Sequence, residues 1–124
     1  MRNTIEIDAL DAKWQFVGRL VDSDDNQARR HREIGLFMAV QNNVIVYIGM
    51  GREKKGGLGK RIRDFVRHTP SARTHPGGLC LHHNQDDVDI YILPIPKRDD
   101  ITKLRWLLIQ RYKPAWNRNK PISR

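Results

Sequence analysis

The chain has 124 residues, 39% hydrophobic and 30% charged, which is the composition of one folded domain and not of a disordered segment. It contains no apolar run long enough to span a membrane and no signal-peptide pattern over residues 1–10, so we expect a cytoplasmic protein without a membrane partner. Its 23 lysines and arginines exceed its 14 acidic residues, and the net charge of +9 favours a polyanionic partner, chiefly nucleic acid.

The N-terminal third leads into a predicted hairpin. We expect residues 1–34 to form an extension and residues 35–124 to form the main domain. Within the extension, the apolar stretch 14–21 is compatible with a strand or with a short helix. Two short apolar runs follow, Gly35–Val40 and Val44–Gly49, and the polar connector 41–43 between them suits a turn. This pattern predicts a β-hairpin.

A glycine-rich basic loop over 51–59 comes next, and a helix is predicted after it. Residues at helical spacing form one face of this helix: Leu58, Ile62, Phe65, Val66 and Thr69. Pro70 ends the helix. Residues 71–78 read as loop because Pro76-Gly77-Gly78 is a strong breaker of regular structure.

The last third of the chain predicts a strand over 88–93 and a helix from about 101 to 112, with Asp99 or Asp100 as its N-cap. At helical pitch, Arg105 falls inside the apolar arc of this helix. A guanidinium there stays charged and needs a partner. Its expected partner is either a phosphate from outside or an internal acid, namely Asp99, Asp64 or an acid of the 86–89 cluster.

Charge is segregated along the chain. Residues 52–67 carry seven basic side chains against two acidic ones, and residues 111–124 carry five basic side chains and no acid. Segregated charge can form a binding face for a phosphate backbone. The predicted nucleic-acid contacts are Lys54, Lys55, Lys60, Arg63, Arg67, Arg111, Lys113, Arg118 and Lys120.

Spacing argues against two other kinds of site. Gly59-Lys60 does not complete a nucleotide-binding P-loop, because Lys54 and Arg61 stand where that motif needs glycine and a hydroxyl residue. The lone Cys80 excludes an internal disulfide, and with its neighbouring histidines it matches no common zinc pattern. We therefore expect neither a metal nor another cofactor.

Four short motifs together resemble the GIY-YIG nuclease family over residues 35–117. They are Gly35-Leu36-Phe37, Tyr47-Ile48-Gly49, Leu58-Gly59-Lys60-Arg61-Ile62 and Lys113-Pro114-Ala115-Trp116-Asn117. The resemblance implies an α/β (α+β) fold with a small, mainly antiparallel three-stranded sheet flanked by helices. It also implies a site around one scissile phosphate. The family's site positions are occupied by Tyr47, Arg61 and Asn117, and by two substitutions, Phe37 for tyrosine and Arg105 for the metal-binding glutamate.

The substitutions decide the predicted function. A guanidinium offers no lone pair to a cation, and phenylalanine lacks the hydroxyl group. We therefore expect a nuclease-derived nucleic-acid-binding protein, with DNA favoured, whose catalysis is impaired. One alternative is an active Mg²⁺- or Mn²⁺-dependent endonuclease with relocated ligands, drawn from Asp86, Asp87, Asp89 and His75. A second is a protein-interaction or regulatory domain in which Arg105 forms an internal salt bridge.

Overall fold

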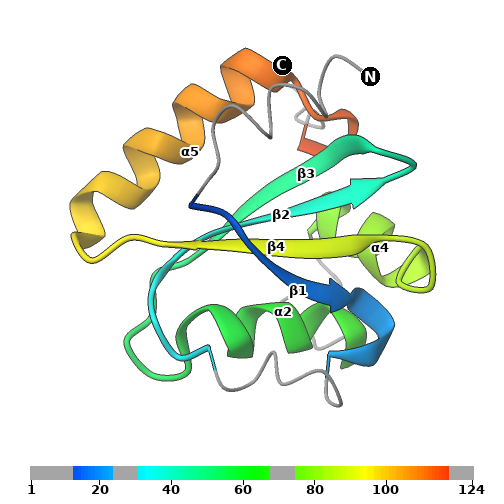
Figure 1. Ribbon diagram of the computed structural model, residues 1–124, viewed down its shortest axis with the longest axis horizontal. Coiled ribbons are helices and arrows are strands. Elements are labelled where there is room, and N and C mark those ends of the chain that lie inside the picture. The colour runs from blue at the N-terminus through cyan, green and yellow to red at the C-terminus, as the bar shows by residue number, and fades with distance from the viewer. Residues whose placement is uncertain (1–12, 24–30, 68–74, 118–124) are drawn as a thin grey trace.

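The computed structural model describes residues 13–23, 31–67 and 75–117 of the chain. In these ranges a sheet lies between helices, as Figure 1 shows. The strands are β1 (Gln15–Arg19), β2 (Gly35–Gln41), β3 (Val44–Gly51) and β4 (Asp89–Pro94). The α-helices are α2 (Gly57–Arg67), α4 (Pro76–His83) and α5 (Arg98–Tyr112), and the short 3-10 helices are η1 (Leu20–Asp22) and η3 (Ala115–Asn117).

The described strands form one antiparallel sheet in the order β1-β4-β2-β3, so β3 is an edge strand. The β2–β3 hairpin is confirmed, with Gly35 opposite Gly51. Asn42 and Asn43 form its turn with φ angles of 53° and 66°. Asparagine is one of the few residues that adopts this left-handed conformation readily, which explains why the turn occurs there.

The sheet has one strand more in the described residues than the resemblance implies. The additional strand, β1, comes from the segment assigned to the N-terminal extension and pairs with β4. The stretch 14–21 is therefore both a strand and, at its end, the 3-10 helix η1. Phe16 packs on Tyr91 with ring centroids 5.3 Å apart, and Arg19 pairs with Asp89 at 2.8 Å. These contacts are between residues distant in sequence, so the local pattern could not reveal them.

Helices cover both faces of the sheet, with α5 on one face and α2 and α4 on the other (Figure 1). Side chains alternate along β3, so Tyr47 enters the core on the α2 side and Ile48 enters the core on the α5 side. The predicted apolar arc of α5 is mostly inward: Leu108 and Tyr112 pack against Ile48 and its neighbours. Leu104, at the border of the arc, is 36% exposed.

Two helix starts differ from the expectation. Pro76 begins α4 where a loop is predicted, because proline is well tolerated in the first turn and His75 accepts a hydrogen bond from the Gly78 amide at 3.2 Å. The N-cap of α5 is Lys97 and makes no side-chain cap. Asp99 and Asp100 lie instead in the first turn, where they interact favourably with the helix dipole. No helix in the described ranges is long and apolar enough to cross a membrane.

Candidate functional site

A cavity of about 290 Å³ lies beside the edge strand β3, between α2 and α5. It includes Tyr47 and Arg61, two positions to which the resemblance gives a family role, and Arg105, one of the two substituted positions. The residues that line it are Tyr47, Met50, Gly51, Arg52, Glu53, Gly57, Arg61, His75 and Arg105. Residues from β3, α2 and α5 therefore converge on one site.

Tyr47 is held rigidly by rings and backbone. Its ring centroid lies 6.3 Å from that of Phe65 and 6.0 Å from that of His75. Gly77 packs so closely on the ring that a Cβ atom at position 77 would collide with it. Burial raises the pKa of the Tyr47 phenol above its ordinary value of 10.0, and the positive charges of Arg105 and Arg61 oppose this rise. At neutral pH Tyr47 is therefore a neutral hydroxyl, able to donate a hydrogen bond.

Arg105 reaches the cavity from α5 across the outer edge of β3. Its Nε donates a hydrogen bond of 3.2 Å to the backbone carbonyl of Ile48. Among the described residues, no acid forms an ion pair with it; Asp64, one of the expected partners, pairs with Lys60 at 3.2 Å. The expectation of an internal acid as partner is therefore not met in this part of the chain. A backbone carbonyl neutralises no charge, so the guanidinium keeps its positive field in the cavity.

Arg61 and Arg52 add two further guanidinium groups. Arg61 lies over the ring of Phe65, 5.2 Å from its centroid, in a cation–π contact. Arg52 is partly buried, and its Nε atom is buried without a hydrogen-bond partner among the described residues. Arg52 was missed as a site residue by sequence reasoning. Its place directly after β3, at the start of the basic segment, is the signal that could have identified it.

The donor set of the cavity does not fit a divalent cation. Of the residues that the structure describes, three arginines line it, and the one carboxylate belongs to Glu53, which is exposed and lies 3.9 Å from Lys60. Divalent cations such as Mg²⁺ and Mn²⁺ need several oxygen or nitrogen lone pairs, which guanidinium groups lack. Within residues 13–23, 31–67 and 75–117, no group of three or more His, Cys, Asp and Glu side chains is arranged to hold a metal. The same donors suit an anion.

Phe37 and Asn117 support the cavity without lining it. Phe37 is buried in the core, with its ring centroid 5.9 Å from that of Tyr47. The side chain of Asn117 accepts from the Ile48 amide at 2.7 Å and donates to the Ile48 carbonyl at 3.0 Å. It thus satisfies the outer backbone groups of the edge strand, as a neighbouring strand would.

The predicted nucleic-acid contacts are dispersed over two regions. Lys54 and Lys55 are exposed in the turn before α2, Lys60 and Arg67 are exposed on α2, and Arg63 is partly buried there. Arg111 is exposed in the last turn of α5, and Lys113 follows as its left-handed C-cap. Arg118 and Lys120 lie outside the described residues.

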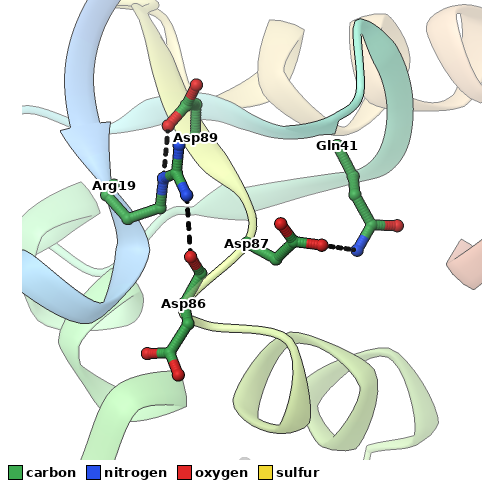
Figure 2. Close-up of polar contacts among 5 residues, drawn as sticks. All are labelled: Arg19, Gln41, Asp86, Asp87 and Asp89. Atoms are coloured by element: carbon green, nitrogen blue, oxygen red, sulfur yellow. Dashed lines mark hydrogen bonds and ion pairs between the residues drawn. The ribbon is translucent and has the colours of Figure 1, made fainter.

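The acids proposed as relocated metal ligands lie at the other end of the sheet. Asp89 begins β4, whereas Gly51 in the cavity aligns, through β2, with Pro94 at the end of β4. Figure 2 shows how these acids are engaged: Arg19 bonds to the Asp89 carboxylate and the Asp86 carbonyl, and Gln41 donates to Asp87 at 2.9 Å. Of the four candidates, His75 is the one that lines the cavity.

Comparison with solved structures identifies the fold. The chain is similar to the GIY-YIG N-terminal endonuclease domain of UvrC from Thermotoga maritima bound to magnesium, with 19% identity and a TM-score of 0.53 over 73% of this chain and 96% of that chain. Two tyrosine-to-phenylalanine point mutants of that domain, bound to the catalytic divalent cation, give TM-scores of 0.50 at 21% and 20% identity, over 73% of this chain and 94% and 96% of theirs. No family model and no curated protein sequence matches the chain. The protein thus has the α+β fold of GIY-YIG endonuclease domains, as the resemblance predicts.

Proposed function

We propose that this protein is a nuclease-derived nucleic-acid-binding domain whose cavity binds a phosphate group in place of a catalytic metal. The observation that carries the proposal is the convergence of Arg61 and Arg105 on Tyr47 from opposite faces of the sheet, without an acid paired to either arginine among the described residues. Paired guanidinium groups recognise phosphate oxygens through charge-assisted, often bidentate hydrogen bonds. The neutral Tyr47 hydroxyl supplies one more donor.

The same geometry argues against metal-dependent cleavage. Arg105 occupies the position that the resemblance assigns to a metal-binding glutamate, and its side chain lines the cavity. Phe37 has no hydroxyl group, and its ring is buried away from the cavity lining. The carboxylates that could have replaced the missing ligand lie at the far end of the sheet, where Arg19 and Gln41 bond to Asp89 and Asp87 (Figure 2). The domain therefore keeps groups that hold a phosphate and lacks groups that would hold the metal.

Lysines near the cavity supply attraction that does not depend on sequence. Lys54 and Lys55 occupy the exposed turn that leads into Gly57, a lining residue. Contacts of this kind release counterions from the nucleic acid, so the binding constant falls steeply with salt. If about four to six phosphates are contacted on duplex DNA, the slope of log K against log salt is about −4 to −5.

The proposal is tested by fluorescence anisotropy with labelled duplex DNA, single-stranded DNA and RNA over a salt series. We expect binding without sequence preference, weakened in Arg61→Gln and Arg105→Gln. Arg98→Gln is the matched control, because Arg98 is exposed in the first turn of α5 and does not line the cavity. Absence of binding at micromolar protein and low salt would reject the proposal, and equal effects of all three substitutions would reject the cavity as the binding site.

A further inference from the structure

We infer that the cavity is selective for a terminal phosphate, the phosphomonoester at the end of a nucleic-acid strand, and that Arg52 is the residue that confers this selectivity. The inference rests on the proposed function and specifies its ligand.

The number of guanidinium groups favours a terminal phosphate. Among the described residues three arginines line the cavity: Arg52 directly after β3, Arg61 in the first turns of α2 and Arg105 in the middle of α5. An internal phosphodiester has two unesterified oxygens and a single negative charge. A phosphomonoester has three such oxygens and a charge of about −1.5 to −2 at pH 7. Three cationic groups can each bind a separate oxygen of the monoester, but they exceed the oxygens of a diester.

Arg52 supplies the group that a diester would leave unused. Its Nε is buried and has no hydrogen-bond partner among the described residues. Because Arg52 lines the cavity and no acid forms an ion pair with it among the described residues, the N–H groups on its two Nη atoms are the donors that an oxygen ligand in the cavity would engage. Arg105 differs, because its Nε already donates to the Ile48 carbonyl.

The other residues that line the cavity do not neutralise the positive charge of Arg52, Arg61 and Arg105. In the part of the chain that the structure describes, Glu53 is the one acid that lines the cavity; it is exposed, and its carboxylate lies 3.9 Å from Lys60. The cavity volume, about 290 Å³, is near the lower end of the roughly 300–1,000 Å³ typical of small-ligand sites. A cavity of this size takes in a single phosphate with its adjoining sugar, which is what a strand end presents.

The test is a competition assay with a labelled oligonucleotide at fixed low ionic strength. The unlabelled competitors share one sequence and carry a 5′-phosphate, a 3′-phosphate or hydroxyl groups at both ends. A hydroxyl-ended competitor lengthened by about two nucleotides matches the charge added by the terminal phosphate. Adenosine monophosphate and inorganic phosphate are added in separate arms, because a free phosphomonoester has the same chemistry as a strand end.

We expect one of the phosphorylated ends to compete about tenfold better than the charge-matched hydroxyl form, the gain from one added charge-assisted contact. In Arg52→Gln the ratio should fall to near unity, whereas Arg98→Gln should leave it unchanged. Competition by the free phosphates in the wild type, weakened in Arg52→Gln, would also support the assignment.

Three results would overturn the inference. Equal competition by phosphorylated and charge-matched hydroxyl ends in the wild type would overturn it alone and leave the proposed function intact; this comparison does not depend on how any variant folds. An end preference that persists in a folded Arg52→Gln protein would remove Arg52 from the site. Binding of free phosphates without binding of any oligonucleotide would overturn both the nucleic-acid end as ligand and the proposed function.

Discussion

Arg105 shares its acceptor with a second side chain. The Ile48 carbonyl accepts from Arg105 Nε at 3.2 Å and from Asn117 Nδ2 at 3.0 Å. If Arg105 is removed, the carbonyl keeps a hydrogen bond, and no buried acid among the described residues loses an ion-pair partner. The stability of the domain should therefore depend little on Arg105, even though the residue is central to the cavity.

Arg105→Gln should accordingly lower the free energy of unfolding by only about 0.5–1.5 kcal/mol, the net value of an ordinary hydrogen bond. It should weaken nucleic-acid binding about tenfold, since a charge-assisted contact is lost. Urea denaturation and anisotropy titrations measure the two effects, with Arg98→Gln as control. A loss of roughly 3–5 kcal/mol would indicate instead that Arg105 belongs to a buried ion pair.

Tyr47 makes stability sensitive to alkaline pH. Burial raises the pKa of its phenol in the folded state above the value of 10.0, and Arg105 and Arg61 reduce this rise. Between the unfolded and the folded pKa, the folded state binds the proton more tightly, so raising the pH favours unfolding. The contribution of the protonated Tyr47 phenol to the free energy of unfolding is complete below pH 10.0 and is lost as the pH rises through the folded-state pKa.

We therefore expect the melting temperature of the wild-type protein to fall above pH 10.0 more steeply than that of Tyr47→Phe. Phenolate absorbance should show a late-titrating tyrosine that is missing in the variant. Tyr91→Phe and Tyr112→Phe are the control variants, and their melting temperatures are measured over the same pH range. Parallel alkaline profiles of wild type and Tyr47→Phe would show that the phenol is not perturbed by burial.

At the scale of elements, η3 completes the edge of β3. The strand has no neighbour on its outer side in the described residues, and the side chain of Asn117 bonds to both backbone groups of Ile48. Because Ile48 adjoins Tyr47, this clamp fixes the strand beside the cavity. Asn117, the position that the resemblance matches to the family's asparagine, thus has a clear structural role in this fold.

Two substitutions at Asn117 distinguish the contribution of its hydrogen bond with the Ile48 amide from that of its hydrogen bond with the Ile48 carbonyl. Asn117→Ala removes the acceptor for the Ile48 amide and should cost about 1–3 kcal/mol, the penalty of leaving a buried donor unpaired. Asn117→Asp keeps that acceptor but sets a second oxygen against the Ile48 carbonyl, so the exchange protection of the Ile48 amide should be retained in the aspartate variant and lost in the alanine variant. Chemical denaturation and hydrogen exchange at the Ile48 amide measure these effects. Equal loss of exchange protection in the two variants would contradict the clamp.

Most of the secondary-structure elements can be predicted from local sequence patterns alone. The hairpin, α2, β4 and most of α5 follow from turn residues and apolar periodicity, and all are confirmed. The prediction of a loop up to residue 78 was wrong at Pro76, Gly77 and Gly78, which begin α4. A Pro-Gly-Gly run is a poor helix former by itself. It becomes helical through the His75 cap and the close packing of Gly77 on Tyr47, which only the folded chain provides.

At the scale of the whole molecule, the arginines of the cavity and the acids Asp86, Asp87 and Asp89 lie at different ends of the sheet. The cavity lies toward the end of β3, with Lys54 and Lys55 in the turn beyond it. The acids Asp86, Asp87 and Asp89 lie just before and at the start of β4, where Arg19 bonds to the Asp89 carboxylate and the Asp86 carbonyl and Gln41 bonds to the Asp87 carboxylate (Figure 2). The acids are therefore too far along the sheet to neutralise the arginines of the cavity.

The purified protein should not cleave plasmid, single-stranded or branched DNA in the presence of Mg²⁺ or Mn²⁺. The reason is chemical: the arginines that line the cavity repel a divalent cation, and Glu53 and His75, the two possible ligands in the described lining, are too few to hold one. Gel assays over a metal series measure this directly. Cleavage that disappears with EDTA and in Arg61→Ala would instead establish an active nuclease with other ligands.

The sequence by itself determined the hairpin, the amphipathic helix that carries Arg61 and the inward position of Arg105, because each follows from spacing within a few residues. Only the tertiary structure decided that β1 joins the sheet and that Arg105 bonds to a backbone carbonyl rather than to an acid. It also brought Arg52 to the cavity with Arg61 and Arg105. These residues meet because α2 and α5 pack on opposite faces of one edge strand, a relation between distant segments that no local pattern encodes.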